Sequence, residues 1–373
     1  PWTTPGASVI TTFVSPEPML WVAGCALIAL LLWWLVRWSL IHARRADAVW
    51  GEAADLLGGE YQRRAGPWYN RVRRIDAAVD GADVVVDHYT VSTGKSAQVF
   101  TRLTAAVTLP GKLRLRVYPK HALSGIADAL GFQDVTTGDA DFDERFVVKA
   151  NDEDMARSWL SARVRQALRK ATAYSFAIKD GKLTAQRTGF EMESQRLVSA
   201  AEATAEMATS GRHLLERWEH FARGEEGVLG AGGGRPRIEI DDRGVPLRIE
   251  TAETKSGSTV TRVRARILDP DAERYEIRQS EAISDGTLSP LQLQQEALPA
   301  RFALASSEPE QTARRLTDQV RRRLARLDPA GVESDGDEVT VVLRGMESDE
   351  ARLRTAVDVA SSLAAESGRG PYR

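Results

Sequence analysis

The chain has 373 residues, of which 43% are hydrophobic, so it holds enough apolar material for two or three ordinary domains. Its formal net charge of −2 creates no global field that would attract nucleic acid, and nucleic acid is therefore not an expected partner. The single cysteine, Cys25, cannot form a disulfide within the chain, so cysteine content leaves the redox compartment open.

The first predicted element is a membrane-spanning helix over residues 19–41. No charged side chain occurs from residue 19 to residue 36, and the span is long enough to cross a bilayer. A cleaved signal peptide fits less well, because no basic residue precedes the apolar run and no small-residue cleavage site follows it. Interfacial anchors are predicted at both ends of the span: Trp21, Trp33, Trp34, Arg37 and Trp38.

Charge asymmetry predicts the orientation of this helix. Residues 1–18 contain no lysine or arginine, whereas Arg37, Arg44 and Arg45 follow the apolar run. By the positive-inside bias, residues 1–18 form a short extracytoplasmic N-terminus and the soluble bulk is cytoplasmic. The richness in Ala, Arg, Leu and Gly suggests a bacterial source. We therefore expect a single-pass protein of a bacterial inner membrane, with the lipid bilayer as one partner.

Residues 42–66 are predicted to connect the span to a first soluble unit, residues 67–222, through a helix over 46–61. Alternating apolar residues predict strands at 72–79, 83–91, 97–109, 112–118 and 142–150. Helices are predicted at 121–130, 152–170 and 192–221, and the dipeptide Asp180-Gly181 predicts a hairpin turn before the last of them.

A glycine-rich segment, residues 223–236, shows no periodicity and is predicted to be a linker. It leads to a second unit, residues 237–373, which repeats the course of the first. Strands are predicted at 237–240, 246–252, 260–268, 275–278 and 301–305, with a weaker pattern at 285–297. Helices are predicted at 307–327 and 348–366, on either side of a hairpin near Asp335-Gly336.

The two units share one pattern, because residues 142–208 align without a gap on residues 298–364 at an offset of 156. The pair Arg145-Phe146 falls on Arg301-Phe302, and we expect a structural salt bridge or carbonyl contact for both arginines. Core periodicity and turn glycines recur throughout. The predicted fold class is therefore α+β: one N-terminal transmembrane helix followed by two duplicated units of antiparallel strands plus strand–helix–hairpin–helix.

Two clusters of charge are candidate sites. Asp139, Asp141 and Asp143 lie close together, but a calcium loop would need a glycine at residue 144 and a carboxylate at residue 150. Cation binding by this cluster stays open, with a turn as the default interpretation. The five histidines are scattered, and we expect no metal and no cofactor.

The second cluster lies on the predicted helix over residues 307–327. Arg315, Arg322 and Arg326 form a stripe on the side away from its apolar face, where they could contact anionic lipid or an acidic partner. The first unit has Trp159 in place of Arg315. We expect Trp159, on the outer side of its helix, to pack against a neighbouring repeat or strand layer.

The stretch TGDADFDERFVVKA, residues 137–150, followed by a helix, a hairpin and a second helix, resembles a bacterial domain family of unknown function. Such domains often follow transmembrane segments. The resemblance covers about residues 130–210, and the second unit departs from it, with Pro299 and Ala300 at two of the acidic positions. It implies a membrane-anchored domain and assigns no catalytic residue.

We find no arrangement of nucleophile, base or metal ligands in the sequence. The leading hypothesis is a non-enzymatic, membrane-anchored structural or scaffold subunit, which acts through contacts between its soluble units and other proteins of a membrane complex. One alternative is a membrane-tethered sensor or binding module for a small ligand or lipid. The other is an enzyme of unrecognised type, in which carboxylates such as Asp139 would converge in a cleft.

Overall fold

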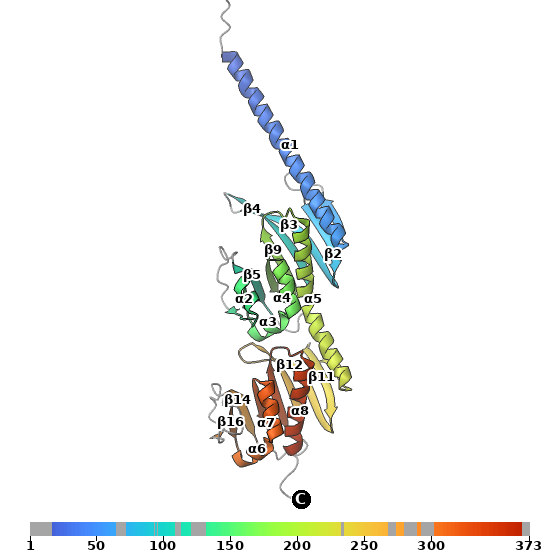
Figure 1. The fold of residues 1–373 in the computed structure, drawn as a ribbon, viewed down its shortest axis with the longest axis vertical. Helices are drawn as coiled ribbons and strands as arrows, with labels where there is room; N and C mark the ends of the chain where they lie inside the picture. The colour runs from blue at the N-terminus through green and yellow to red at the C-terminus, as the bar shows by residue number, and fades with distance from the viewer. Residues whose placement is uncertain are drawn as a thin grey trace, which may run out of the picture.

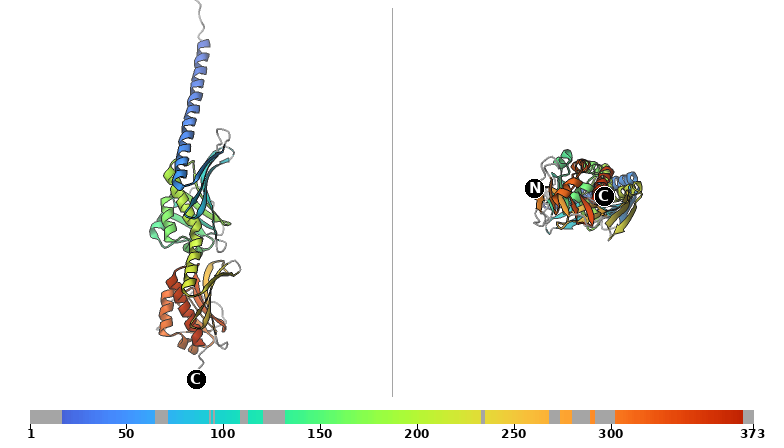
Figure 2. Two further views of the ribbon diagram at one scale, coloured as in Figure 1. Left: turned by 90° about the vertical axis from the view of Figure 1, so that its right-hand side faces the viewer. Right: turned by 90° about the horizontal axis from the view of Figure 1, so that it is seen from below.

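The computed structural model describes residues 17–64, 72–92, 94, 96–108, 113–120, 132–232, 235–267, 274–279, 289–291 and 302–367. It is a mixed helix and strand structure in which one long N-terminal helix leads into two units, each with an antiparallel sheet. The first unit runs from strand β1 to helix α5, and the second from β10 to α8. The two units follow one another along a single long axis (Figures 1 and 2).

Helix α1 is a continuous helix, Glu17–Leu57, of 41 residues. The separate connecting helix predicted after residue 46 is therefore the second half of α1. From Cys25 onward this helix is long and apolar enough to cross a membrane, and its most apolar window has no buried residue. Trp50, Ala53 and Ala54, near the other end, are buried against the first sheet. One helix thus has an exposed apolar half and a packed half.

The first sheet has the strand order β1-β2-β3-β4-β9-β8-β5-β7-β6, with antiparallel pairs throughout. Alternating residues of β2, such as Ile75 and Ala77, are buried beneath the helices, as expected for a sheet with one covered face. The bounds are β1 Glu60–Arg64, β2 Val72–Val79, β3 Ala82–Ser92, β4 Ala97–Ala106, β5 Leu115–Pro119, β6 Gln133–Asp134, β7 Phe146–Ala150, β8 Ser175–Lys179 and β9 Lys182–Thr188.

The helices of the first unit are α2 Ala140–Arg145, α3 Glu153–Trp159, α4 Ala162–Lys170 and α5 Ser194–Gly224. The single helix predicted over residues 152–170 is wrong, because the helix stops at Leu160 and begins again. The Ser161 hydroxyl accepts a hydrogen bond from the Val164 N–H and caps α4. Helix α5 extends well beyond the sheet that it covers and continues to the second unit (Figure 1).

The second sheet has the order β10-β11-β12-β13-β18-β17-β14-β16-β15, which repeats the order of the first sheet strand for strand. Its strands are β10 Val228–Gly232, β11 Arg235–Asp242, β12 Val245–Glu253, β13 Thr259–Arg266, β14 Tyr275–Gln279, β15 Ser289–Leu291, β16 Phe302–Ser306, β17 Gly331–Ser334 and β18 Glu338–Arg344. Its helices are α6 Pro309–Arg315, α7 Asp318–Leu327 and α8 Glu350–Ser367.

Two predictions for the second unit change. The predicted helix over 307–327 also divides, because Thr317 caps α7 by accepting from the Val320 N–H. The segment predicted as an irregular linker, residues 223–236, contains the end of α5 and strand β10, which pairs with β11. Three predicted stretches lie wholly or mostly outside the described residues: residues 1–16 of the predicted N-terminal segment 1–18, the predicted helix 121–130 and most of 285–297.

Candidate functional site

Helix α1 enters the first unit through a buried tryptophan. The Trp50 side chain is fully buried, its Nε1–H donates to the Glu191 carbonyl oxygen at 3.1 Å, and its ring stacks on Phe190 at 5.1 Å between centroids. Because Glu191 lies just before α5, this contact joins α1 to the start of α5, the last helix of the first unit. An exposed apolar helix is thereby attached directly to the folded core.

An acidic clamp, Asp47 with Tyr61, Arg63 and Arg73, lies one turn before Trp50. Asp47 accepts hydrogen bonds from Arg73 Nε at 2.7 Å and from the Tyr61 hydroxyl at 2.9 Å. Burial raises the pKa of Asp47, but the hydrogen bonds from Arg73 and Tyr61 outweigh it and leave that pKa below its ordinary value. Burial and the bond to Asp47 raise the pKa of Tyr61 to about 12. The clamp is therefore ionic around neutral pH.

The second unit joins the first through an equivalent tryptophan. The Trp218 side chain on α5 is fully buried, and its Nε1–H donates to the Glu347 carbonyl oxygen at 2.6 Å. Trp50 and Trp218 each precede a glycine by nine residues, Gly59 and Gly227, where an added Cβ would lie 2.8 and 2.7 Å from backbone oxygens of the following sheet. Each leading helix therefore ends in a close turn onto its sheet.

A buried aspartate fixes the contact between the units. Asp152 caps α3 by accepting from the Met155 N–H at 3.0 Å, and its other oxygen accepts from the Thr259 N–H of β13 at 2.5 Å. Gly345 lies against α3 so closely that a Cβ there would be 2.7 Å from the Asp154 carbonyl oxygen. Burial in this contact raises the pKa of Asp154. The two units are thus packed on one another.

The same hydrogen-bond network begins the last helix of each unit. In the first unit the Thr101 hydroxyl donates to the Gly189 carbonyl and accepts from the Glu191 N–H, both at 2.9 Å. In the second unit Thr261, Gly345 and Glu347 repeat these bonds at the same distances. Glu191 and Glu347 each accept from the next two backbone N–H groups. Both glutamates thereby hold the short segment that leads into the last helix.

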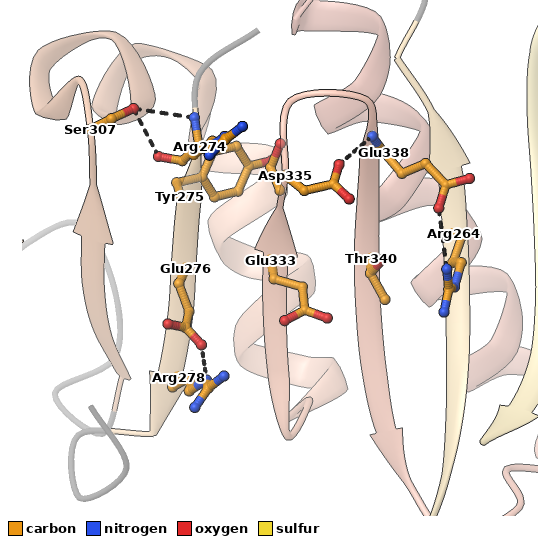
Figure 3. Close-up of a pocket in the computed structure, with 11 residues that line it drawn as sticks. Arg264, Arg274, Tyr275, Glu276, Arg278, Ser307, Glu333, Asp335, Glu338 and Thr340 are labelled. Atoms are coloured by element: carbon orange, nitrogen blue, oxygen red, sulfur yellow. Dashed lines mark hydrogen bonds and ion pairs between the residues drawn. The ribbon is translucent and has the colours of Figure 1, made fainter. Parts of the chain in front are cut away.

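A wide groove of about 820 Å³ crosses the face of the second sheet that the helices leave uncovered (Figure 3). The strands β14, β17, β18 and β13 supply its floor, and the helices lie behind them in the figure. Polar and charged side chains line it: Arg264, Arg274, Tyr275, Glu276, Arg278, Ser307, Glu333, Ser334, Asp335, Glu338 and Thr340. This groove is a candidate contact surface of the second unit.

Charges of both signs alternate across the groove. Arg264 lies between Glu250 at 3.2 Å and Glu338 at 3.4 Å, and Arg278 pairs with Glu276 (Figure 3). Glu333 projects from β17 and is exposed. The groove thus offers a surface of mixed charge to a polar partner.

The predicted acidic cluster is used inside the first unit. Asp139 caps α2 and accepts from Arg165 at 3.0 Å and Arg169 at 2.6 Å, and the Arg169 and Phe142 hydrogen bonds lower its pKa to about 2. Asp141 pairs with Arg145 and Arg169, while Asp143 accepts from the Thr137 backbone N–H and hydroxyl. The described residues hold no group of three or more candidate metal ligands.

The predicted arginine stripe is divided between two helices. Arg315 ends α6 and is buried, which corrects its predicted solvent exposure, because the break at Leu316 removes the continuous helix on which that prediction depended. Arg322 and Arg326 are exposed and one turn apart on α7. The prediction for Trp159 needs the same correction: it is fully buried, and its Nε1–H donates to the Met207 carbonyl of α5 at 3.0 Å.

The predicted anchors lie on the apolar half of α1. The side chains of Trp33, Trp34 and Trp38 are 59%, 55% and 49% exposed, and the Arg37 guanidinium lies 5.4 Å from the Trp33 ring centroid. Trp21 belongs to α1, but its side chain lies outside the described ones. Among the paired residues, Phe146 and Phe302 are buried, Arg145 is exposed and bonded to Asp141, and Arg301 lies outside the described residues.

Sequence reasoning did not identify Trp50, Trp218 or the groove. The equal spacing from each tryptophan to its glycine was the available signal, but it lies outside the aligned stretch of residues 142–208 and 298–364. The groove had no signal, because its residues come from strands far apart in the chain.

No protein-family model matches the chain, and no curated protein sequence matches it. Among solved structures, the chain is similar to the crystal structure of the mycobacterial trehalose monomycolate transport factor A, TtfA. That match has 10% sequence identity and a TM-score of 0.32, and it covers 42% of this chain and 94% of that chain. A similarity of this size carries no argument about function.

Proposed function

We propose that this chain is a membrane-anchored, non-enzymatic scaffold subunit of a bacterial membrane-associated complex, which acts through contacts between its soluble units and other proteins. The continuity of α1 carries the proposal. Its exposed half has the length and composition of a membrane span, and its other half is held by Trp50 and the acidic clamp. Such an attachment sets the orientation of the units to the bilayer, whereas a flexible linker would leave it free.

The groove of the second sheet supports a protein partner over a small ligand. Small-molecule sites are enclosed and mostly apolar, whereas this groove is open and lined by charged side chains. Arg322 and Arg326 lie in the unit farther from α1, so an acidic segment of a protein suits them better than the lipid of the same membrane (Figure 1). The favoured partner is therefore a protein with a polar, charged contact surface.

We further infer that the two units arose by duplication and that both are cytoplasmic. The matching strand orders and the paired Thr101 and Thr261 networks support the duplication. Arg44 and Arg45, exposed on α1 beyond the apolar half, support the orientation. A reporter enzyme that is active only in the periplasm, fused after Arg373, should give no signal, and activity there would reverse the orientation.

The scaffold proposal is tested by purification in mild detergent from the native membrane. We expect stoichiometric partner proteins to copurify, and the groove variant Glu333→Arg to lose at least one of them, because it reverses an exposed charge at the contact surface. Asp83→Arg, the same change at an exposed position on the first sheet, is the matched control. A monodisperse protein without any partner at native abundance would contradict the proposal.

A further inference from the structure

The hairpin formed by β3 and β4 projects beyond the rest of the first sheet on the side of α1's apolar half (Figure 2). Thr101 and Thr261 occupy equivalent positions, so the two hairpins can be compared from the pairs His88–Thr101 and Thr251–Thr261. Twelve residues separate the first pair and nine the second. The hairpin of the first unit is thus the longer of the two.

The height of this hairpin follows from contacts with α1. The rings of Trp50 and His88 lie 5.8 Å apart between centroids, so these two residues lie at the same position along the axis of α1. Nine residues back along α1 lead to Ile41, roughly 13 Å away at the helical rise. Four residues onward along β3 lead to Ser92, again roughly 13 Å away in a strand. The end of the hairpin at Ser92 therefore lies about as far along the axis of α1 as Ile41, where the predicted membrane span ends.

The chemistry of the hairpin end differs from that of its equivalent. Between Tyr89 and Thr101 the sequence contains no acidic residue and one basic residue, Lys95, and Val91 is 40% exposed. On the same face Tyr89 stacks on Phe100 at 5.3 Å, and Arg102 lies 4.8 Å from the Tyr89 ring centroid. The hairpin of the second unit carries Glu253 and Lys255 in the corresponding region. Tyrosine is a residue typical of the bilayer interface.

The equivalent hairpin of the second unit, formed by β12 and β13, makes a contact at its end. Thr259, at its end, donates its N–H to Asp152, so this hairpin rests on the unit above it. The first hairpin has the same place in its own unit, but the apolar half of α1 lies above it (Figure 1). We propose that the β3–β4 hairpin rests on the lipid headgroup layer as a second membrane contact beside α1. This inference depends on the proposed membrane anchorage of α1.

The test uses the full chain in vesicles of phosphatidylcholine and phosphatidylglycerol, with one fluorescent label attached to an introduced cysteine. Cys25→Ser removes the native thiol, and Val91→Cys and Gln98→Cys place labels on paired, exposed positions of the hairpin. Lys182→Cys, at the exposed first residue of β9 and at the opposite end of the same sheet, is the matched control. A nitroxide on the lipid headgroup quenches labels near the membrane surface.

We expect headgroup nitroxide to quench both hairpin labels and to leave the Lys182 label unchanged. Quenching of the two hairpin labels no stronger than that of the Lys182 label would overturn the hairpin contact. This outcome counts only if nitroxide within the acyl chains quenches a label on native Cys25. A Cys25 label without that quenching would overturn the membrane anchorage itself, and the hairpin inference with it. The two failures are therefore distinguishable.

Discussion

The two places where a helix enters a unit are built alike at their centres and differently around them. Trp50 and Trp218 each donate to the carbonyl oxygen of a glutamate that lies just before the last helix of a unit. Three residues before each tryptophan, however, the first unit has Asp47 paired with Arg73, and the second has Leu215, which packs against the core. The tryptophan contact is thus common to both junctions, whereas the ionic clamp belongs to the junction of α1, the candidate membrane-spanning helix.

This difference suggests two roles for the same geometry. Between the units, α5 packs through buried side chains such as Leu214 and Phe221, and Asp152 bonds the Thr259 N–H of the second sheet. At the other junction α1 follows a stretch long and apolar enough to cross a membrane, and Arg73 holds the helix through the Asp47 carboxylate and the Ala43 carbonyl oxygen. The following substitutions test this comparison, beginning with the largest expected effect.

Trp50→Ala and Trp218→Ala should each lower the free energy of unfolding by about 3–5 kcal/mol, because each removes a fully buried aromatic side chain. Denaturation of the full chain in detergent, followed by circular dichroism, measures both losses. The comparison predicts similar values for the two variants. A loss at only one junction would show that the shared contact is not equally important at both.

Glu191→Gln should lower the free energy of unfolding by about 3–5 kcal/mol. The buried Glu191 pairs with Arg187, and neutralising the carboxylate leaves the charge of Arg187 uncompensated. Glu347→Gln should cost about 1 kcal/mol, because its partner Arg352 is 40% exposed. The same denaturation experiment measures both variants. Equal costs would contradict the ranking by burial.

Acidification should remove the contribution of Asp139 to stability only at unusually low pH. Hydrogen bonds from Arg169, the Phe142 N–H and Arg165 lower its pKa from 3.8 to about 2, so its contribution to stability is complete above 3.8 and is lost as the pH falls toward 2. The stability difference between the unaltered chain and Asp139→Asn should be constant above about pH 4. It should vanish near pH 2 in an acid titration followed by circular dichroism, and a difference that vanished near neutral pH would refute this assignment.

Arg322→Ala and Arg326→Ala should change the free energy of unfolding by less than about 0.5 kcal/mol, since both side chains are exposed. Arg165→Ala on the corresponding helix of the first unit should cost about 1 kcal/mol, because Arg165 bonds Asp139 and the Leu160 carbonyl. Denaturation measures all three variants. A large loss from Arg326→Ala would mean that this arginine supports the fold rather than a partner contact.

Local patterns predicted much of the fold. The strand predicted at residues 72–79 is β2, because alternation directly reports one covered face. The two divided helices were not predicted, although Ser161 and Thr317 lie at the same offset and both have the side chain of an N-cap. Apolar spacing continued through both breaks, and this periodicity concealed the caps. The faces assigned to Trp159 and Arg315 were therefore wrong.

The contacts that position the units could not be predicted from periodicity. Trp50 and Glu191 lie 141 residues apart in the chain, and neither interrupts a local pattern. The ion pairs of the acidic cluster could not be predicted for the same reason, because Arg165 and Arg169 bond Asp139 from a different helix. Pairing across such separations depends on the sheet order, which a single sequence does not specify.

Helix α5 belongs to the first unit and also packs on the second, and this has a mechanical consequence. Its 31 residues form a strut of about 45 Å that carries no break between the first sheet and the second. With α1 seated in the bilayer, the groove of the second sheet stands at one fixed elevation over the lipid. A protein that docks there must either extend equally far from the membrane surface or approach from the side away from the bilayer.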